Sequence, residues 1–225
     1  MSAVYVVATP IGNLQDITLR GIQTLRDTEI IICEDTRVTQ VLLNKFNIKE
    51  KKLIALNEFN EEEVIPNILE IVLSRDIALV SDAGTPLISD PGFRLIREAK
   101  KRNILTIPIP GPTAPITALS VSGFPTDKFT FLGFLPKSQA KQYKIFEKYK
   151  NENHTVIFFE SPHRLTKTLK TLDECFGDIS ICLARELTKK FEEIINLRIS
   201  DHLKIYKNKK PKGEFTIIFN PSITF

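Results

Sequence analysis

The residues best suited to chemistry lie in one loop, residues 80–92, with the sequence Val-Ser-Asp-Ala-Gly-Thr-Pro-Leu-Ile-Ser-Asp-Pro-Gly. Gly84 and Gly92 permit backbone conformations that are closed to other residues, and the two prolines stiffen the segment. Four polar residues of this loop can fix a ligand: Asp82, Thr85, Ser89 and Asp90. A stiff turn with an aspartate cap would also account for this composition, but a loop so dense in special residues is more often functional.

The elements that must position this loop are a strand and a helix. An apolar run at 77–80 is typical of a buried strand, and apolar spacing at 93–102 predicts an amphipathic helix. Ligands of open α/β sheets bind at the carboxyl ends of strands, where this loop would lie. The first half continues the same alternation, with strands predicted at 4–8, 29–33, 53–56, 77–80 and 105–109 and helices at 18–25, 38–46, 61–73, 93–102 and 116–122. It indicates an α/β lobe with a mainly parallel sheet.

The alternation of strands and helices changes after Gly123. The strand predicted at 129–135 has no crossover helix before it. Further strands are predicted at 156–159, 179–184, 192–197 and 215–219, and helices at 138–149 and 164–175. We expect two domains, an N-terminal α/β lobe over 1–123 and a C-terminal α+β lobe with a mixed sheet over 124–225.

Composition narrows the class of protein. The 225 residues are 42% hydrophobic with a net charge of +4, so a core can form and a polyanionic partner is permitted. No segment has the roughly 20 apolar residues of a membrane span, and no secretion signal is visible. Three scattered cysteines fit a reducing cytoplasm, and the three histidines lack metal-ligand spacing, so no metal is expected.

Several familiar motifs are missing. The loop after the first strand carries a single glycine, Gly12, which disfavours both a dinucleotide fingerprint and a P-loop. There is also no Gly-x-Ser-x-Gly nucleophile elbow.

Other loops are also rich in glycine, proline and polar or charged residues, as residues 80–92 are. Each of these loops adjoins a predicted strand end. The set comprises 9–14 (ThrProIleGlyAsnLeu), 34–37 (GluAspThrArg), 81–92, 110–112 (ProGlyPro), 133–136 (GlyPheLeuPro), 185–189 (ArgGluLeuThrLys) and 212–214 (LysGlyGlu). In this order, over nearly the whole chain, the set resembles the ribosomal RNA small-subunit methyltransferase I family of the tetrapyrrole-methylase superfamily. Ala8 stands where that family commonly has proline, and many of its members continue past the point that corresponds to Phe219.

The resemblance implies a bilobed tetrapyrrole-methylase-like fold, usually homodimeric, with S-adenosylmethionine in a cleft between the lobes. It also implies 2′-O-methylation of a cytidine ribose in 16S ribosomal RNA of the small subunit. The residues that it assigns to the cofactor are Pro10, Asp82, Ala83, Gly84, Thr85, Ile88, Thr113, Ala114, Phe134, Leu135, Ala184, Gly213, Glu214, Phe215 and Thr216. For Phe134 and Leu135 an ordinary core position is an equal alternative.

Methyl transfer from a sulfonium to a hydroxyl is an in-line displacement that needs neither a metal nor a covalent intermediate. Alignment of the reactants can supply most of the acceleration, although a base could help a weakly acidic hydroxyl. The candidate catalytic residues are Asp35, Glu160 and Glu186 as bases, with Arg37 and Arg185 placing phosphates. A helix cap with an ion pair would also explain Asp35 and Arg37, and a salt bridge would explain Arg185 and Glu186. His163 ranks below the carboxylates.

Two lysine clusters are candidates for RNA contact. Lys137, Lys141, Lys144 and Lys148 are spaced to share one helix face, and a second cluster comprises Lys207, Lys209, Lys210 and Lys212. Both could neutralise RNA phosphates. A solvated helix face is the alternative for the first cluster.

Two other functions remain open at this stage. A tetrapyrrole methyltransferase would keep the fold and cofactor, but the lysine-rich second half argues against an apolar substrate. A noncatalytic RNA-binding or ribosome-assembly protein is the other alternative, and the intact loop 80–92 argues against loss of catalysis.

Overall fold

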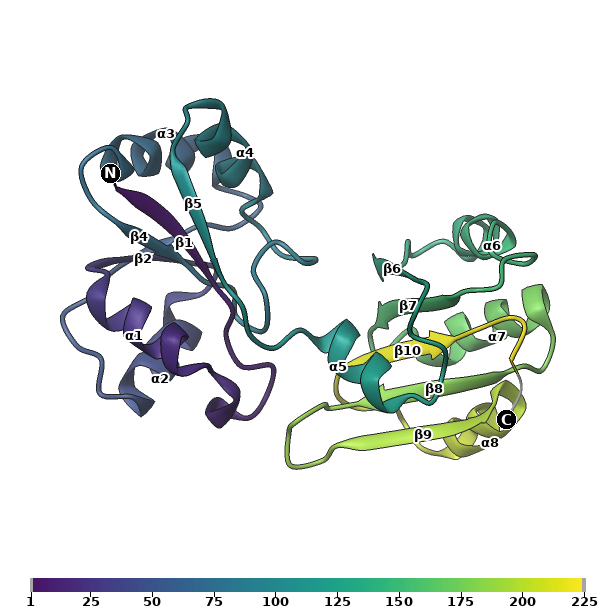
Figure 1. Cartoon of the computed structure of the whole chain (residues 1–225). Coiled ribbons are helices and arrows are strands. Elements are labelled where there is room, and N and C mark those ends of the chain that lie inside the picture. The colour runs from purple at the N-terminus through teal and green to yellow at the C-terminus, as the bar shows by residue number, and fades with distance from the viewer. Residues whose placement is uncertain (1, 224–225) are drawn as a thin grey trace. The chain divides into compact units, whose positions relative to one another are not determined.

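The computed structural model describes residues 2–223. They form two compact units, which divide between Thr113 and Ala114 (Figure 1). The boundary therefore precedes helix α5 (Ala114–Val121) rather than following it at Gly123. The reason is packing, because α5 contacts strands of the second sheet.

The first unit is built on a five-stranded, fully parallel sheet in the order β3-β2-β4-β1-β5. Its strands are β1 (Ala3–Val7), β2 (Ile30–Cys33), β3 (Lys52–Ala55), β4 (Ile77–Leu79) and β5 (Leu105–Ile109). β2 and β4 are buried throughout, as expected for central strands covered on both faces. The parallel α/β prediction for this half is confirmed.

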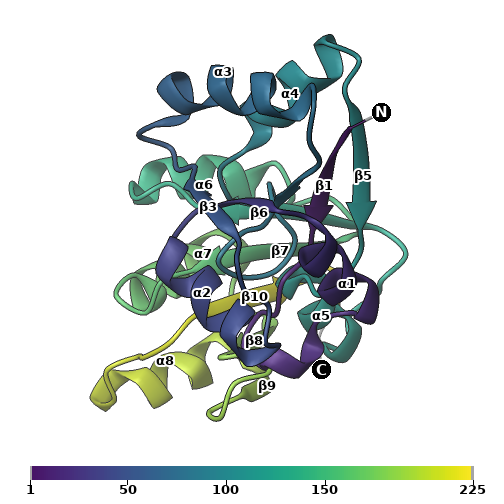
Figure 2. The ribbon, with the colours of Figure 1, turned by 90° about the vertical axis from the view of Figure 1, so that its left-hand side faces the viewer.

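Two pairs of helices cover the two faces of this sheet (Figure 1, Figure 2). The helices are α1 (Leu19–Asp27), α2 (Thr36–Lys45), α3 (Glu61–Val72) and α4 (Phe93–Lys101). α1 and α2 bury Leu25 and Leu43 in one core, and α3 and α4 bury Ile68 and Leu95 in the other. The strand connections therefore leave the sheet toward both of its faces.

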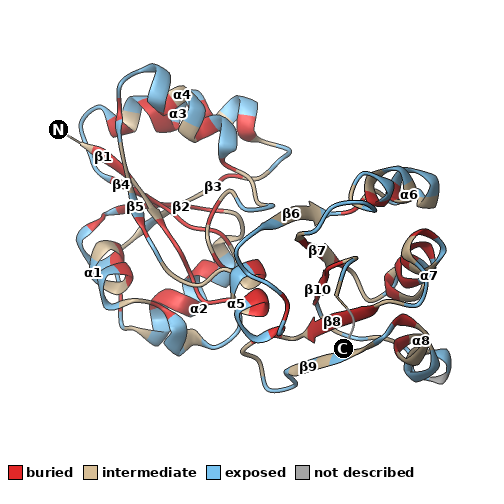
Figure 3. Cartoon of the chain, turned by 45° about the vertical axis from the view of Figure 1, so that its right-hand side comes forward, coloured by how far each residue is buried: buried red, intermediate tan, exposed pale blue. Residues whose placement is uncertain are grey.

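The second unit has a mixed five-stranded sheet in the order β6-β7-β10-β8-β9, in which only β6 and β7 are parallel. Its strands are β6 (Phe129–Phe134), β7 (Thr155–Glu160), β8 (Ser180–Arg185), β9 (Glu193–Arg198) and β10 (Phe215–Phe219). The helices α6 (Gln139–Glu147), α7 (Leu165–Phe176) and α8 (Ile199–Asn208) cover one face of this sheet (Figure 3). Phe146, Leu169 and Ile199 belong to the core of this unit.

The sequence analysis did not predict helix α8, although its apolar residues have helical spacing. Ile199, Leu203 and Tyr206 are spaced by four and three residues, and all three belong to or pack on the core of the second unit. The other predicted elements appear with shifted ends. No helix in residues 2–223 is long and apolar enough to cross a membrane.

Candidate functional site

The carboxyl edge of the parallel sheet has a topological switch point between β1 and β4. The connection after β1 leads through α1 toward β2, whereas the connection after β4 leads through α4 to β5 on the other side of β1. Adjacent loops that diverge in this way open a crevice, which is the usual ligand position in open α/β sheets. Both the loop at 8–13 and loop 80–92 begin there.

Hydrogen bonds join these two loops directly. The Thr9 N–H donates to the Gly84 carbonyl at 2.8 Å, and the Gly84 N–H returns a bond to the Thr9 carbonyl at 3.1 Å. The buried Thr9 hydroxyl also donates to the Ser81 carbonyl at 3.1 Å. The two loops are thus hydrogen-bonded to each other at the switch point.

The loop after β5 closes against the same pair. The Thr85 hydroxyl donates to the Pro112 carbonyl at 3.0 Å. Gly84 has φ +85, and a Cβ there would lie 3.2 Å from Cγ2 of Ile11 and 3.7 Å from the Pro112 oxygen. A Cβ at Gly111 would lie 2.9 Å from the Ala8 Cβ. Glycine is needed at 84 both for the left-handed backbone and for the close approach of three loops.

The far end of loop 80–92 is held by a residue that the sequence analysis did not single out. The carboxylate of Glu61, only 9% exposed at the start of α3, accepts from the Gly92 N–H at 2.8 Å. Leu87 and Ser89 in the loop have φ of +76 and +69. Left-handed backbone at non-glycine residues is costly and clusters at ligand sites, where packing enforces it. No local pattern in the sequence distinguishes Glu61 from its acidic neighbours.

A cluster of carboxylates lies at this edge. Burial raises the pKa of Asp90 to about 6. The negative charge of Asp82 adds to this shift, and a hydrogen bond from Ser81 opposes it. Burial chiefly, with the charge of Asp35, raises the pKa of Asp82. The pKa of Glu34 is raised by burial and then by Asp82 and Asp90. The mutual repulsion of these groups favours a cationic ligand. Asp90 is one of the polar residues of loop 80–92 that the sequence analysis considered able to fix a ligand, but it is not among the residues that the resemblance assigns to the cofactor.

Asp82 connects this cluster to the loop after β2. Its Oδ1 accepts from the Asp35 N–H at 3.0 Å. The Asp35 side chain itself caps α2, accepting from the Arg37 N–H at 2.8 Å, and pairs with the Arg37 guanidinium. The hydrogen bonds from Arg37 lower the pKa of Asp35 to about 2. The cap and ion pair considered as alternatives are both present, and a carboxylate with so low a pKa is a weak base at neutral pH.

The remaining predicted residues of the first unit follow the same edge. Pro10 is buried, Thr113 is half-buried, and Ala83 and Ile88 are exposed. The structure therefore brings together, within this unit, Pro10, Asp35, Asp82, Ala83, Gly84, Thr85, Ile88 and Thr113.

In the second unit, hydrogen-bond donors surround the carboxylate of Glu160. Its side chain is 0% exposed and accepts from the Arg164 Nε at 2.7 Å, from the Ser161 N–H at 2.7 Å and from the Thr168 hydroxyl. The carboxylate joins the end of β7 to the start of α7. A structural role accounts for this arrangement better than that of a catalytic base.

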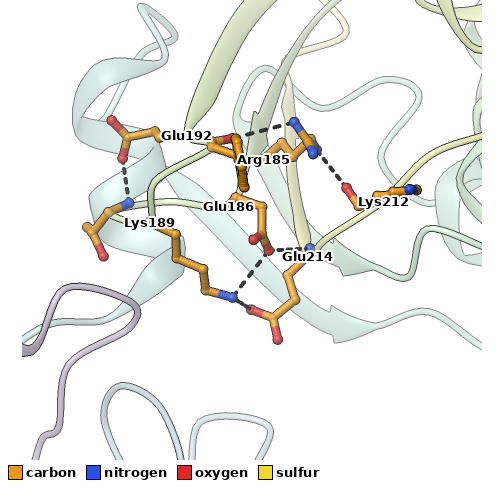
Figure 4. A network of polar contacts seen from close by, with 8 residues as sticks. Arg185, Glu186, Lys189, Glu192, Lys212 and Glu214 are labelled. Carbon is orange, nitrogen blue, oxygen red and sulfur yellow. Dashed lines mark hydrogen bonds and ion pairs between the residues drawn. The ribbon is translucent and has the colours of Figure 1, made fainter. Parts of the chain in front are cut away.

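Glu186 is also engaged, in a network at the ends of β8 and β10 (Figure 4). Its Oε1 accepts from the Glu214 N–H at 3.0 Å and pairs with Lys189 at 3.2 Å. Burial acts in the opposite direction, but the Glu214 N–H and Lys189 lower the pKa of Glu186. Gly213 has φ +89, and a Cβ there would lie 2.5 Å from the Glu186 Cγ, so another residue would strain the backbone and displace the Glu186 side chain.

The second-unit residues predicted for the cofactor have different surroundings. Leu135 and Phe215 lie in the core, and Ala184 pairs with Thr216 between β8 and β10. Phe134 is 60% exposed and its ring lies 5.3 Å from that of Phe159. Ala114 is half-buried at the start of α5, and Glu214 is exposed.

Only part of the first lysine cluster lies on a helix, although the spacing predicted that all four lysines share one helix face. Lys141 and Lys144 lie on α6, where Lys141 is exposed and Gln142 and Phe146 on the other side are buried. Lys137 and Lys148 lie just outside the helix. Among the described residues, no three His, Cys, Asp or Glu side chains group as metal ligands.

The two units, with a crevice at the switch point of the parallel sheet, define the fold class, and comparisons with known proteins identify the family. Residues 3–202 match the family described as Tetrapyrrole (Corrin/Porphyrin) Methylases. A solved structure of diphthine synthase superposes with a TM-score of 0.77, covering 100% of this chain and 92% of that one at 14% identity, which shows the shared fold. The chain belongs to the tetrapyrrole methylase family.

Curated relatives narrow the identification. The chain is 43% identical to ribosomal RNA small subunit methyltransferase I of Thermotoga maritima, over 98% of this chain and 99% of that protein. It is 44% identical to the protein of the same name from Rickettsia prowazekii, over 99% of this chain and 79% of that protein. The chain is therefore a methyltransferase of this family, and S-adenosylmethionine is its methyl donor.

Proposed function

We propose that the protein transfers the methyl group of S-adenosylmethionine to the 2′-oxygen of a cytidine ribose in 16S ribosomal RNA of the small subunit. The observation that carries the proposal is 43% identity to a ribosomal RNA small subunit methyltransferase I over essentially the full length of both chains. The motif loops on which the sequence prediction rested support it.

The carboxyl edge of the first unit fits the charge of the cofactor. S-adenosylmethionine, when bound, supplies an electrophilic methyl group on a sulfonium and also carries a cationic ammonium group. Asp82, Asp90 and Glu34 are close enough for the charge of one to raise the pKa of another, so a nearby cation would relieve their repulsion. Backbone groups of loop 80–92 and the loop after β5, held by Thr85, would position it. We propose that this edge contacts the cofactor.

The second unit would contribute Phe134, Leu135, Ala184 and residues 213–216, which stays a prediction. For the reaction step, Asp35 has a low pKa, and Glu160 and Glu186 accept bonds from their neighbours. We therefore assign no base and attribute the acceleration to alignment of the hydroxyl with the methyl group. Lys141 and Lys144 on α6 would bind RNA phosphates.

We also propose that the protein works as a homodimer in the cytoplasm, as the family resemblance implies. Analytical ultracentrifugation at several protein concentrations tests the dimer, and a monomer throughout would exclude it.

The decisive experiment incubates the protein with tritiated S-adenosylmethionine and small subunits from cells that lack the corresponding methyltransferase. Nuclease digestion and mass spectrometry then locate the label. Label on a cytidine 2′-oxygen supports the proposal. Cofactor binding without label on RNA would overturn it.

A further inference from the structure

The second unit contains a pocket that the proposed cofactor and lysine-face contacts leave unused. It has a volume of about 390 Å³ and lies among the end of β8, the start of β9, the end of α8 and the loop that leads to β10. Its lining residues are Arg185, Glu193, Tyr206, Lys209, Lys210, Pro211 and Lys212. Ligand pockets of proteins typically measure about 300–1,000 Å³, so the volume suits a small group such as a nucleotide fragment.

The charge of the lining is strongly positive. Four of the lining residues are basic and only Glu193 is acidic. Glu193 is paired with Arg185 at 2.8 Å, which neutralises one charge on each side. Within residues 2–223, Lys209, Lys210 and Lys212 are exposed and make no ion pair. Three uncompensated ammonium groups around one hollow favour an anionic ligand.

Arg185 gives the pocket a fixed wall. Its side chain is 16% exposed, and its Nε donates to the Lys212 carbonyl at 2.6 Å (Figure 4). This bond ties the loop to β8, while Nη1 is used by Glu193. In the described part of the chain, Nη2 donates to no protein acceptor. A guanidinium held in place with a donor to spare is well suited to a phosphate oxygen.

An aromatic ring forms another wall. Tyr206 on α8 is held edge-on to the core residue Phe215, with ring centroids 6.1 Å apart. An anchored ring beside a cationic group can take the face of a base or sugar, as in single-stranded nucleic acid sites.

The pocket adjoins the strand ends that are predicted for the cofactor. Arg185 directly follows Ala184, and Lys212 directly precedes Gly213. β8 and β10 are neighbours here, with Ala184 opposite Thr216. A phosphate in the pocket would therefore lie beside the residues that this unit is predicted to contribute to the cofactor.

We propose that this pocket binds a backbone phosphate of the RNA substrate close to the methylated nucleotide, through Arg185, Lys209, Lys210 and Lys212. The proposal rests on the proposed RNA substrate. A free phosphate or nucleotide offers the same chemistry, and the experiment separates the two sources.

The test compares two charge-matched double variants. Lys209→Gln/Lys210→Gln removes two pocket charges, and Lys167→Gln/Lys170→Gln removes two charges from α7, outside the pocket. Binding of short single-stranded RNA and of small subunits is measured at several salt concentrations, together with cofactor affinity and the KM for small subunits. Binding of inorganic phosphate is measured separately by calorimetry.

The pocket variant is expected to bind RNA at least ten-fold more weakly and to raise the KM for subunits. The dependence of log affinity on log salt should become shallower by about 0.7 for each phosphate that the variant no longer neutralises. Cofactor affinity and all properties of the α7 variant should stay at wild-type values. Equal RNA affinity and salt dependence in both variants and wild type would overturn the pocket assignment. If the pocket variant binds inorganic phosphate less well but RNA equally well, RNA is the wrong source.

The proposed function fails independently. If the wild-type protein binds RNA in a pocket-dependent way but never methylates small subunits, the pocket stands and the reaction is wrong. If the wild-type protein neither binds nor methylates RNA, both proposals fall.

Discussion

Asp90 offers the sharpest test of the electrostatics at the carboxyl edge. Its pKa is raised from 3.8 to about 6, chiefly by burial. Because the folded state disfavours the ionised form, the stability of the protein falls as the pH rises from about 4 to about 6, and the loss persists above that range. Below the unfolded pKa both states are protonated and the penalty vanishes.

The size of the penalty follows from the shift. Each pKa unit corresponds to 1.36 kcal/mol, so the full shift would amount to about 3 kcal/mol. Solvent reaches part of this side chain, and we expect about 1–2 kcal/mol after that screening. Asp90→Asn keeps the shape of the residue and removes its charge. It should stabilise the protein by this amount at neutral pH and by little near pH 4.

The measurement is thermal unfolding from about pH 4 to pH 8 for wild type, Asp90→Asn and the control Asp16→Asn, which changes an exposed residue of the same unit. For a chain of this length 1 kcal/mol shifts Tm by about 2–4 °C, so Asp90→Asn should melt about 2–8 °C higher at neutral pH. Cofactor affinity should fall at the same time, because a counter-charge is removed. An unchanged Tm at neutral pH, or an equal gain at pH 4, would refute the reasoning.

Three further outcomes are expected. Gly84→Ala should lower stability by about 1–2 kcal/mol, because the backbone at this position is left-handed, and it should weaken cofactor binding in calorimetry about ten-fold. The control Gly177→Ala, where φ is also positive but the space around a Cβ is open, should lower Tm only. Equal cofactor affinity in the two variants would count against the site. Glu160→Gln should lower stability by about 3 kcal/mol, since it breaks a buried pair, and the folded fraction should keep its kcat; a normal Tm with abolished kcat would restore Glu160 as a base. Lys141→Glu/Lys144→Glu should weaken RNA binding in filter assays and leave cofactor affinity intact; unchanged RNA affinity at every salt concentration would exclude this face.

Much of the fold was predictable because its signals are local. Apolar runs such as 77–80 and helical spacing such as 93–102 identify strands and helices from neighbouring residues alone. The alternation of these elements then predicts a parallel sheet, which the structure confirms. Helix α8 was not predicted, although Ile199, Leu203 and Tyr206 have the apolar spacing of an amphipathic helix.

The candidate site was predictable only in part. Loop 80–92 was found because glycine, proline and aspartate indicate an unusual backbone in the sequence itself. Glu61 was not found, because its role depends on the distance to Gly92, 31 positions away. The raised pKa of Asp90 and the enclosure of Glu160 depend on burial, which no local pattern predicts.

The sequence by itself determined the family, the order of strands and helices in the first half, and the loops that carry special residues. The tertiary structure decided which of those residues act on one another. Asp82 receives the Asp35 N–H although 47 positions separate them, because parallel strands deliver their following loops to one edge. It also assigned α5 to the second unit and gave Glu160 and Glu186 to bonding networks, since burial and hydrogen bonding arise only from contacts distant in the chain.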